Sequence, residues 1–283
     1  MTARTSPTQR QRRVGAELRR MRVAADVSAE SAAAVLNVSR SQLSAIEQGL
    51  RAVSEERLRT LAARCGVTEK PYVDKLSALA QPRERGWWEA YRGAIPQGLL
   101  DISELEWHAT RLCTVQTVHL PGLLHQGSYA RAVFGSVLPA LPPSEVEMRV
   151  AHRLKRQQVL EGDDARPYDA YVHEAALRMQ FGGRRATREQ LEYLCEASQR
   201  DNLTLRVLPV ETGAFPGAGH AMLYAEGAVP QLDTVQLDSA HGPEFMHDEA
   251  QLAKYQSHIH WMDQHALTPG ASRDFIHAIA HHL

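Results

Sequence analysis

Residues 39–49 place one arginine and several short polar side chains at the spacing of one helix face. Leu43 and Ile46 fall three apart on the opposite face, where they can be buried. The outward set consists of Arg40, Ser41, Ser44 and Ala45. An arginine can donate two hydrogen bonds to one guanine, and such short neighbours allow a nucleic-acid backbone to approach closely. This face therefore offers non-covalent recognition of the edge of a DNA groove.

Local signals predict both ends of this helix and of the helix before it. Ser39 can accept a hydrogen bond from a free amide of the first turn, and Gln42 can reach back to the Ser39 amide. Gly49 supplies the left-handed conformation that ends the helix. The preceding helix is capped by Ser28 and closed by Asn37, a residue type that tolerates positive φ. Two helices joined by so tight a turn indicate a helix-turn-helix.

Residues 14–67 resemble the Cro/C1-type helix-turn-helix of the XRE family of bacterial regulators. A helix with an apolar stripe before residue 26, a helix opened by Ser54 and a last helix from Thr68 to Leu79 complete the five-helix order of that domain. The matching residues are Val27-Ser28, Leu36, Val38-Ser39-Arg40-Ser41, Leu43-Ser44, Ile46-Glu47, Gly49, Leu58, Leu61 and Gly66-Val67. The resemblance implies a DNA-binding domain over residues 1–80.

The same resemblance implies a role for each polar side chain of the motif. Base contacts in the major groove are implied for Arg40, Ser41, Ser44 and Ala45. DNA backbone contacts are implied for Ser28, Gln42, Gln48 and Arg51. Arg22 and Glu47 match the family's internal ion pair, which is structural rather than a DNA contact. One departure is Ala29, because the family usually has a glutamine there that grips a phosphate.

The charge distribution agrees with a DNA-binding amino end. Residues 1–64 hold 12 Arg and 6 Asp/Glu, net +6, which leaves 20 Lys/Arg and 27 Asp/Glu, net −7, for residues 65–283. A basic domain attracts phosphates, and the acidic remainder is repelled by them. No apolar run approaches membrane length, and the amino end has no signal-like apolar core. We therefore expect a cytoplasmic protein.

The second part, residues 81–283, is predicted to be a larger mixed α/β domain. Its boundary is the helix-breaking Gln81-Pro82-Arg83. Strands are predicted at 115–118, 169–173, 204–208, 221–225 and 234–237, and helices at 103–112, 174–180, 187–197, 250–265 and 272–282. A helix after Pro142-Pro143 should bury Val146, Val150 and Leu154, with its arginines on the other side. The whole chain is thus expected to be mainly α with an α/β part.

This second part resembles the DUF5753 domain of actinomycete regulators. The resemblance rests on Trp87-Trp88, Pro121-Gly122-Leu123-Leu124, Tyr129-Ala130-Arg131, Arg156-Gln157, Glu174-Ala175-Ala176-Leu177-Arg178, Gly182-Gly183, Gln190-Leu191, Leu205-Arg206-Val207-Leu208-Pro209 and Ala266-Leu267. Members often lie beside a small DUF397 protein, and some are described as antitoxin-like. His125-Gln126 departs from the family's usual Gln-Thr, which bears on any ligand or partner that this turn contacts.

The residue patterns support no enzyme, no cofactor and no metal site. His173-Glu174 opens a helix, but Leu177 stands where a zinc protease needs its second histidine. Walker, Gly-x-Ser-x-Gly and zinc-deaminase patterns are absent from the sequence. His277 and His281 are four apart and could share an ion, but regularly spaced carboxylate or cysteine partners are missing. The three cysteines show no paired spacing.

Two functions are therefore considered further. A third, an enzyme with a DNA-targeting domain, is supported by no catalytic motif in the sequence. The first is a sequence-specific transcriptional regulator, a homodimer on a palindromic operator in double-stranded DNA. Its carboxyl domain would dimerise and answer a small-molecule effector or a small partner protein. The alternative is an antitoxin-like module that neutralises a DUF397-type partner and regulates its own operon.

Overall fold

The computed structural model of the chain describes residues 7–81 and 85–283. It divides into two compact units, one up to Trp87 together with Ala228–Leu232, the other Trp88–Gly227 together with Asp233–Leu283. Pro82 and Arg83 of the expected break lie outside the described residues, and the boundary after residue 80 stays a prediction. Each unit has its own apolar core.

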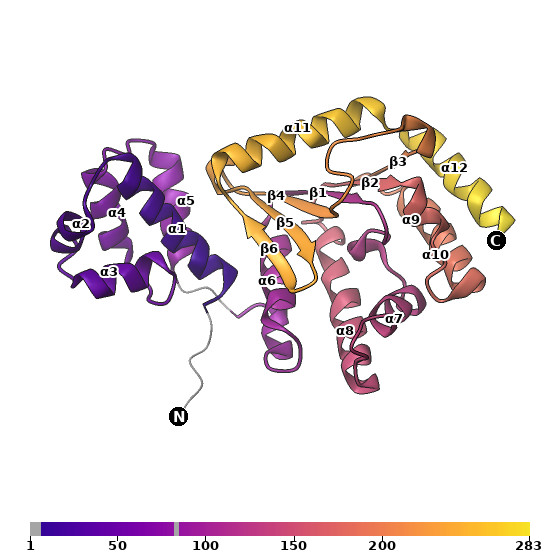
Figure 1. Ribbon diagram of the computed structural model, residues 1–283, viewed down its shortest axis with the longest axis horizontal. Coiled ribbons are helices and arrows are strands. Elements are labelled where there is room, and N and C mark those ends of the chain that lie inside the picture. The colour runs from indigo at the N-terminus through magenta and orange to yellow at the C-terminus, as the bar shows by residue number, and fades with distance from the viewer. Residues whose placement is uncertain (1–6, 82–84) are drawn as a thin grey trace. The chain divides into compact units, whose positions relative to one another are not determined.

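The first unit is a small helical domain, as predicted (Figure 1). Within the described residues 9–80 its helices are α1 (Gln9–Ala24), α2 (Ala29–Val35), α3 (Arg40–Glu47), α4 (Glu55–Arg64) and α5 (Lys70–Ala80). Leu18, Leu58 and Leu76 are fully buried where three of these helices meet. The 3.6-residue apolar period of the sequence therefore selects the faces that form the core.

A buried carboxylate joins the first helix to the last one of this unit. Glu17 on α1 is fully buried and lies 2.6 Å from Arg20 Nη2 and 3.3 Å from Arg13 Nη2. The Tyr72 hydroxyl of α5 donates a hydrogen bond to the same carboxylate. Burial, and then the charge of Glu17, raises the pKa of Tyr72 above its usual value. The phenol therefore stays protonated and acts as a donor.

In the described part of the second unit, six strands form one mixed sheet in the order β3-β2-β1-β4-β5-β6. The strands are β1 (Arg111–Gln116), β2 (Tyr168–His173), β3 (Leu203–Leu208), β4 (Met222–Glu226), β5 (Thr234–Ser239) and β6 (Gly242–Met246). β1, β2 and β3 pair in parallel, and β4, β5 and β6 continue the sheet antiparallel from β1. The predicted α/β region is thereby confirmed.

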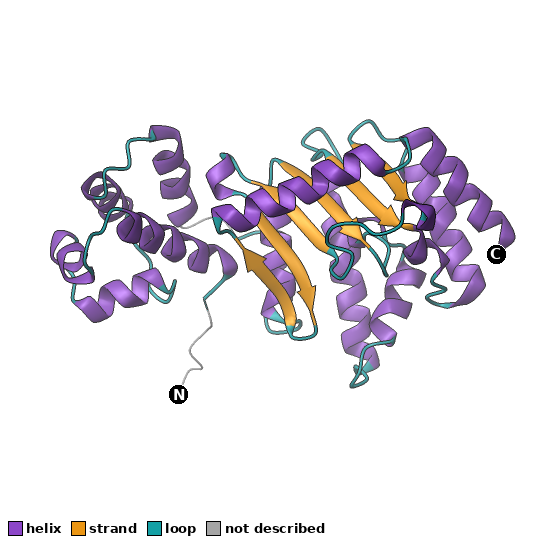
Figure 2. Cartoon of the chain, turned by 45° about the horizontal axis from the view of Figure 1, so that its top comes forward, coloured by secondary structure: helices purple, strands orange, loops and turns teal. Residues whose placement is uncertain are grey.

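Helices cover both faces of this sheet. The α-helices are α6 (Gln97–His108), α7 (Gly127–Gly135), α8 (Pro143–Arg156), α9 (Glu174–Arg178), α10 (Gly183–Ala197), α11 (Glu249–His265) and α12 (Pro269–His282). Short 3-10 turns are η1 (Trp87–Tyr91), η2 (Gly122–Leu124), η3 (Gln157–Leu160), η4 (Val210–Thr212) and η5 (Pro230–Leu232). α11 crosses one face of the sheet, while α6 and α8 lie on the opposite side (Figures 1 and 2).

Alternating strand residues build a separate core on each face. In β4, Met222 and Tyr224 pack in the cluster that includes α11 residues, whereas Leu223 and Ala225 pack in the cluster with α10 and α12. Because successive side chains of a strand point to opposite faces of the sheet, a strand buried on both faces needs apolar residues at odd and at even positions. The same alternation separates Tyr171 from its neighbours in β2.

Three expectations for this unit were wrong in part. The helix predicted at 103–112 runs from Gln97 to His108, and the strand that follows begins at Arg111 rather than at residue 115. β6 was not predicted, because Gly242-Pro243 reads as a turn. On α8, Leu154 is exposed while Arg156 is buried, the reverse of the expected faces. Arg156 is buried because it pairs with Glu106 at 2.5 Å, a partner that the helix pattern does not show.

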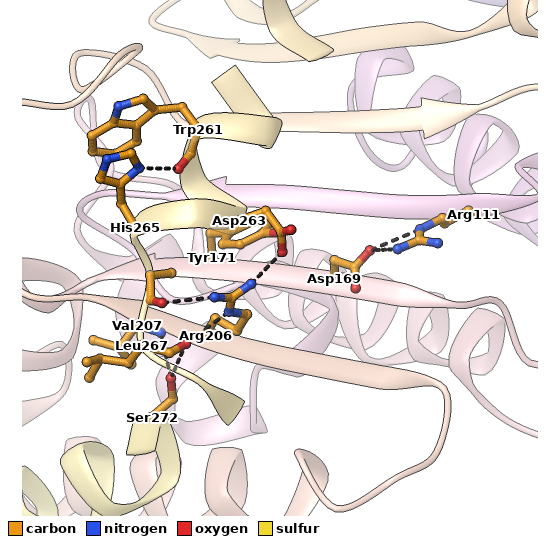
Figure 3. A network of polar contacts seen from close by, with 11 residues as sticks. Arg111, Asp169, Tyr171, Arg206, Val207, Trp261, Asp263, His265, Leu267 and Ser272 are labelled. Carbon is orange, nitrogen blue, oxygen red and sulfur yellow. Dashed lines mark hydrogen bonds and ion pairs between the residues drawn. The ribbon is translucent and has the colours of Figure 1, made fainter. Parts of the chain in front are cut away.

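The connection between α11 and α12 is fastened to the edge strand β3 (Figure 3). Arg206 donates to the carbonyl oxygens of Ala266 and Leu267, each at 2.9 Å, and pairs with Asp263. The Val207 amide donates to Ser272 Oγ at 2.9 Å. An arginine at a helix carboxyl end satisfies carbonyls that the helix leaves unpaired, and the covered strand edge cannot pair with another chain.

Replacing Arg206 by methionine should destabilise this connection. The variant keeps the aliphatic stem but leaves two carbonyls without their donor, so we expect a loss of about 1–3 kcal/mol in local stability. Hydrogen exchange of peptides from the end of α11 and from α12 measures it. Asp263→Asn is the control, because this side chain is 60% exposed and its loss should cost less. Equal exchange in Arg206→Met and the wild type would contradict the assignment.

Candidate DNA-binding surface

Helix α3 has the capped amino end that the sequence predicts. Ser39 Oγ accepts a hydrogen bond from the Gln42 amide at 3.1 Å, and Gln42 Oε1 accepts one from the Ser39 amide at 3.0 Å. At the other end Gly49 has φ +73°, and Asn37 closes the preceding helix with φ +51°. These contacts confirm the predicted local signals, each of which contributes about 1 kcal/mol to helix stability.

On its inner face, α3 packs so closely against α1 that the two backbones are in contact. Leu43 and Ile46 are buried in the core of the first unit. A Cβ added at Gly15 of α1 would stand 2.5 Å from the Ile46 carbonyl oxygen, and one added at Gly49 would stand 2.7 Å from the Gln11 backbone. Only glycine permits this close approach, so the position of α3 is set by backbone contact with α1.

An ion pair fixes the end of α3 to α1. Arg22 Nε and Nη2 lie 2.6 and 3.0 Å from the two carboxylate oxygens of Glu47, and both side chains are mostly buried. Arg22 Nη1 also donates to the Val27 carbonyl at 3.1 Å, which ties in the segment that leads to α2. The hydrogen bonds that Arg22 donates to Glu47 raise the pKa of Arg22. Both groups are engaged inside the unit rather than on its surface.

The outer face of α3 carries the predicted base-contact residues. Arg40, Ser41 and Ser44 are exposed, and Ala45 is half-buried. Arg40 is 75% exposed, and its Nη1 is 3.9 Å from the carboxylate of Glu30, itself 82% exposed. A pair that long and that exposed is weak, so Arg40 can leave it for another acceptor at little cost.

The predicted backbone-contact residues lie around this face. Ser28 Oγ accepts from the Ser31 amide at 3.1 Å as the cap of α2, which leaves its hydroxyl hydrogen available. Gln42 uses its carbonyl in the cap of α3 and keeps its amide donors. Gln48 is exposed and donates to Ser44 Oγ at 3.1 Å, and Arg51 is exposed in the loop after α3. These donors suit phosphate oxygens, and their contacts with DNA stay predictions.

Comparison with family models identifies both parts of the chain. A helix-turn-helix domain model matches residues 13–71, and the model of a domain of unknown function, DUF5753, matches residues 99–278, more than half of the 283-residue chain. The chain belongs to the DUF5753 family. No curated protein and no solved structure matches it.

These matches confirm the helix-turn-helix domain and the DUF5753 domain expected from the sequence. The DUF5753 protein therefore carries a DNA-binding helix-turn-helix, whereas its assignment to the Cro/C1 type stays a prediction. None of the helices in the described part of the chain has the length and apolar character that a bilayer crossing requires. Among the same residues, no group of three His, Cys, Asp or Glu side chains could hold a metal ion.

Trp88, on the 3-10 turn η1, packs inside the second unit. Trp88 is buried and meets Trp107 edge-on, with ring centroids 6.3 Å apart, and His108 at 6.0 Å. A buried ring of this kind contributes to packing rather than to stacking with bases. Trp88 is therefore not available for stacking on bases, and the surface around α3 is the candidate for DNA contact.

Removing the charge of Glu47 should loosen α3. In Glu47→Gln, Arg22 is left mostly buried without a counter-ion, and we expect the local opening free energy of α3 to fall by about 2–3 kcal/mol. Hydrogen exchange of peptides covering residues 40–47 measures it. Combining Glu47→Leu with Arg22→Met should restore much of the protection, because the pair is then replaced by apolar contact. No change in the single variant would contradict a structural role for the pair.

Proposed function

We propose that this DUF5753 protein is a sequence-specific transcriptional regulator that reads the DNA major groove with α3. The observation that carries the proposal is the difference between the two faces of this helix. Its inner residues and its ends are held by the domain, while Arg40, Ser41 and Ser44 are exposed on the other face. Arg40 has only the 3.9 Å pair with Glu30, and the hydrogen bonds of Ser41 Oγ with Ser39 Oγ and of Ser44 Oγ with Gln48 Nε2 lie at the surface, where contacts with DNA can replace them. A rigid helix with an uncommitted polar face suits base recognition.

The proposal includes dimeric binding to a palindromic operator in double-stranded DNA. One helix-turn-helix covers only a half-site, so two copies with half-sites about one helical turn apart give the required length. The acidic carboxyl part, net −7 over residues 65–283, is repelled by phosphates and suits a controlling rather than a DNA-wrapping role. We propose that it controls DNA binding through a small molecule or a partner protein, and that no catalytic step is involved.

Selection from a random DNA pool tests the proposal directly. The full chain should enrich a two-fold symmetric sequence, and its affinity should fall steeply with salt because phosphate contacts release counter-ions. Enrichment of no sequence, with equal affinity for every pool member, would reject sequence-specific regulation.

Arg40→Ala should relax sequence preference. If Arg40 makes a bidentate contact to guanine, its loss costs about 1–3 kcal/mol on the selected site and little on random DNA. Competition gel shifts with both DNAs measure the difference. Arg64→Ala is the matched control, because Arg64 is an exposed arginine at the far end of α4. An equal loss on both DNAs would reject the role of Arg40.

Arg51→Ala should act on all sequences alike. A phosphate contact carries no base information, so specific and random DNA should weaken similarly, and the salt slope should flatten by about one unit. Affinities measured over a series of salt concentrations give that slope. A slope unchanged from the wild type would place Arg51 outside the interface.

A further inference from the structure

The second unit contains a cavity of about 530 Å³ that the DNA-binding proposal does not use. It lies between the sheet and helices α6 and α8, and residues 117–120, which follow the carboxyl end of β1, form part of its wall. The order of the strands reverses at β1, since β2 lies on one side of it and β4 on the other. Ligands of open α/β sheets bind beyond the carboxyl ends of parallel strands such as β1 and β2, and this volume is in the usual range of small-molecule sites.

Polar side chains lie on both sides of Leu223 on the sheet surface that faces the cavity, whereas the rest of that face is apolar. On this face β1 contributes Thr114 and Gln116, and β5 contributes Gln236. The same face elsewhere presents residues such as Ala170 and Val207 to the core. Thr114 and Gln236 are nonetheless buried. Thr114 Oγ1 donates to the Met222 carbonyl at 2.8 Å and accepts from Gln116 Nε2 at 3.0 Å, and Gln236 Nε2 donates to Asp238 at 2.9 Å. The side-chain carbonyl oxygens of Gln116 and Gln236 remain available to a bound molecule.

Two arginines line the cavity, and a carboxylate balances the charge of one of them, Arg156. Arg156 of α8 makes a bidentate ion pair with Glu106 of α6, with N–O distances of 2.5 and 2.8 Å. Both side chains are buried, and the pair satisfies both charges. Arg156 therefore has a structural role, in joining α6 to α8.

Arg153, one turn earlier on α8, has no such partner. Among the described residues it forms no ion pair, and its buried Nε has no hydrogen-bond partner. Its guanidinium lies over the Phe134 ring, 4.3 Å from the centroid. Burial, and then the charge of Arg156, lowers the pKa of Arg153 to about 9, so it remains cationic at neutral pH. Asp238 also lines the cavity, but it is exposed and accepts from Gln236 at 2.9 Å.

A neutral histidine orients this arginine. His125 Nε2 donates to the Leu120 carbonyl at 2.8 Å, so Nδ1 carries no proton and accepts from Arg153 Nη1 at 3.1 Å. Burial, and then the charge of Arg153, lowers the pKa of His125 well below its usual value. The Gln157 amide holds the same turn by donating to the His125 carbonyl at 2.6 Å. A cation without an ion-pair partner among the described residues is thus held in place at the cavity wall, with only the more distant carboxylate charges of Asp238 and Glu106 acting on it.

We propose that this cavity binds a small organic carboxylate whose anionic group pairs with Arg153. Its apolar body would lie against Leu123, Val133 and Phe134, and Gln116 and Gln236 offer hydrogen bonds to its polar substituents. A single free guanidinium in a largely apolar wall suits a monoanion, because a phosphate dianion needs more donors. The site stands on the second unit alone, whereas its role as the regulatory signal rests on the proposed function.

Isothermal titration of the full chain without DNA tests the site. The probes are octanoate, phenylacetate and benzoate, each matched with its neutral amide. We expect at least one carboxylate to bind, with its amide about ten-fold weaker or more, a difference of about 1.4 kcal/mol. Arg153→Met should weaken that carboxylate by at least the same factor. Lys155→Met is the control, because Lys155 is an exposed cation on the same helix and should bind as the wild type does.

Two results would overturn the site: no carboxylate binding by the wild type at millimolar concentration, or equal binding by Arg153→Met. Without ligand, Arg153→Met should keep or raise the melting temperature, since it removes an unpaired buried charge. If this variant does not fold, Arg153→Lys replaces it and should also bind more weakly than the wild type, because it loses the planar fork.

Gel shifts with and without the bound carboxylate separate this inference from the proposed function. A ligand that changes the DNA affinity of the wild type but not of Arg153→Met supports both the site and its regulatory role. A ligand that binds and leaves DNA affinity unchanged supports the site and rejects the role. Absence of sequence-selective binding in the random-pool selection rejects the proposed function and leaves the titration result intact.

Discussion

A charge placed inside this protein needs an opposite charge beside it, and that constraint organises both units. Glu17, Glu47 and Glu106 are buried or nearly so, and each receives at least one arginine. The pair of Glu47 with Arg22 joins α3 to α1, and the pair of Glu106 with Arg156 joins α6 to α8. Glu17 is held by arginines of its own helix and by Tyr72 of α5. The Coulomb energy of such pairs offsets desolvation only when the geometry is good, so each pair specifies one arrangement of its helices.

Arg153 departs from that pattern, because it has no ion-pair partner among the described residues. Its guanidinium lies over the Phe134 ring and donates a hydrogen bond to the neutral imidazole of His125. Both contacts lower the free-energy cost of burying the cation, but neither neutralises its charge. Neighbouring Arg156 shows that the fold can supply a carboxylate at this depth. The contrast between the two arginines distinguishes a residue that holds the structure together from one that is kept ready for a partner.

The sequence predicts the first unit better than the second for a physical reason. Caps and turns such as Ser39 and Gly49 are local, so a few neighbouring residues determine them. β6 depends instead on pairing with β5, which no pattern around Pro243 reveals. The free guanidinium of Arg153 was equally hidden, because helix periodicity placed it on a solvated face, and only the fold shows its cavity. The chemistry of a buried site depends on non-local contacts in this way.

The buried and the exposed residues of α3 have different roles, and this difference has an evolutionary consequence. Because Leu43, Ile46 and the Gly15 contact carry the stability of the helix, the outward positions are free to vary without unfolding the domain. If α3 contacts DNA as proposed, descendants of this gene could acquire new binding sites through a few exchanges at those positions. Gene duplication would then yield proteins with divergent DNA sites and a shared architecture, in which the second unit is inherited unchanged.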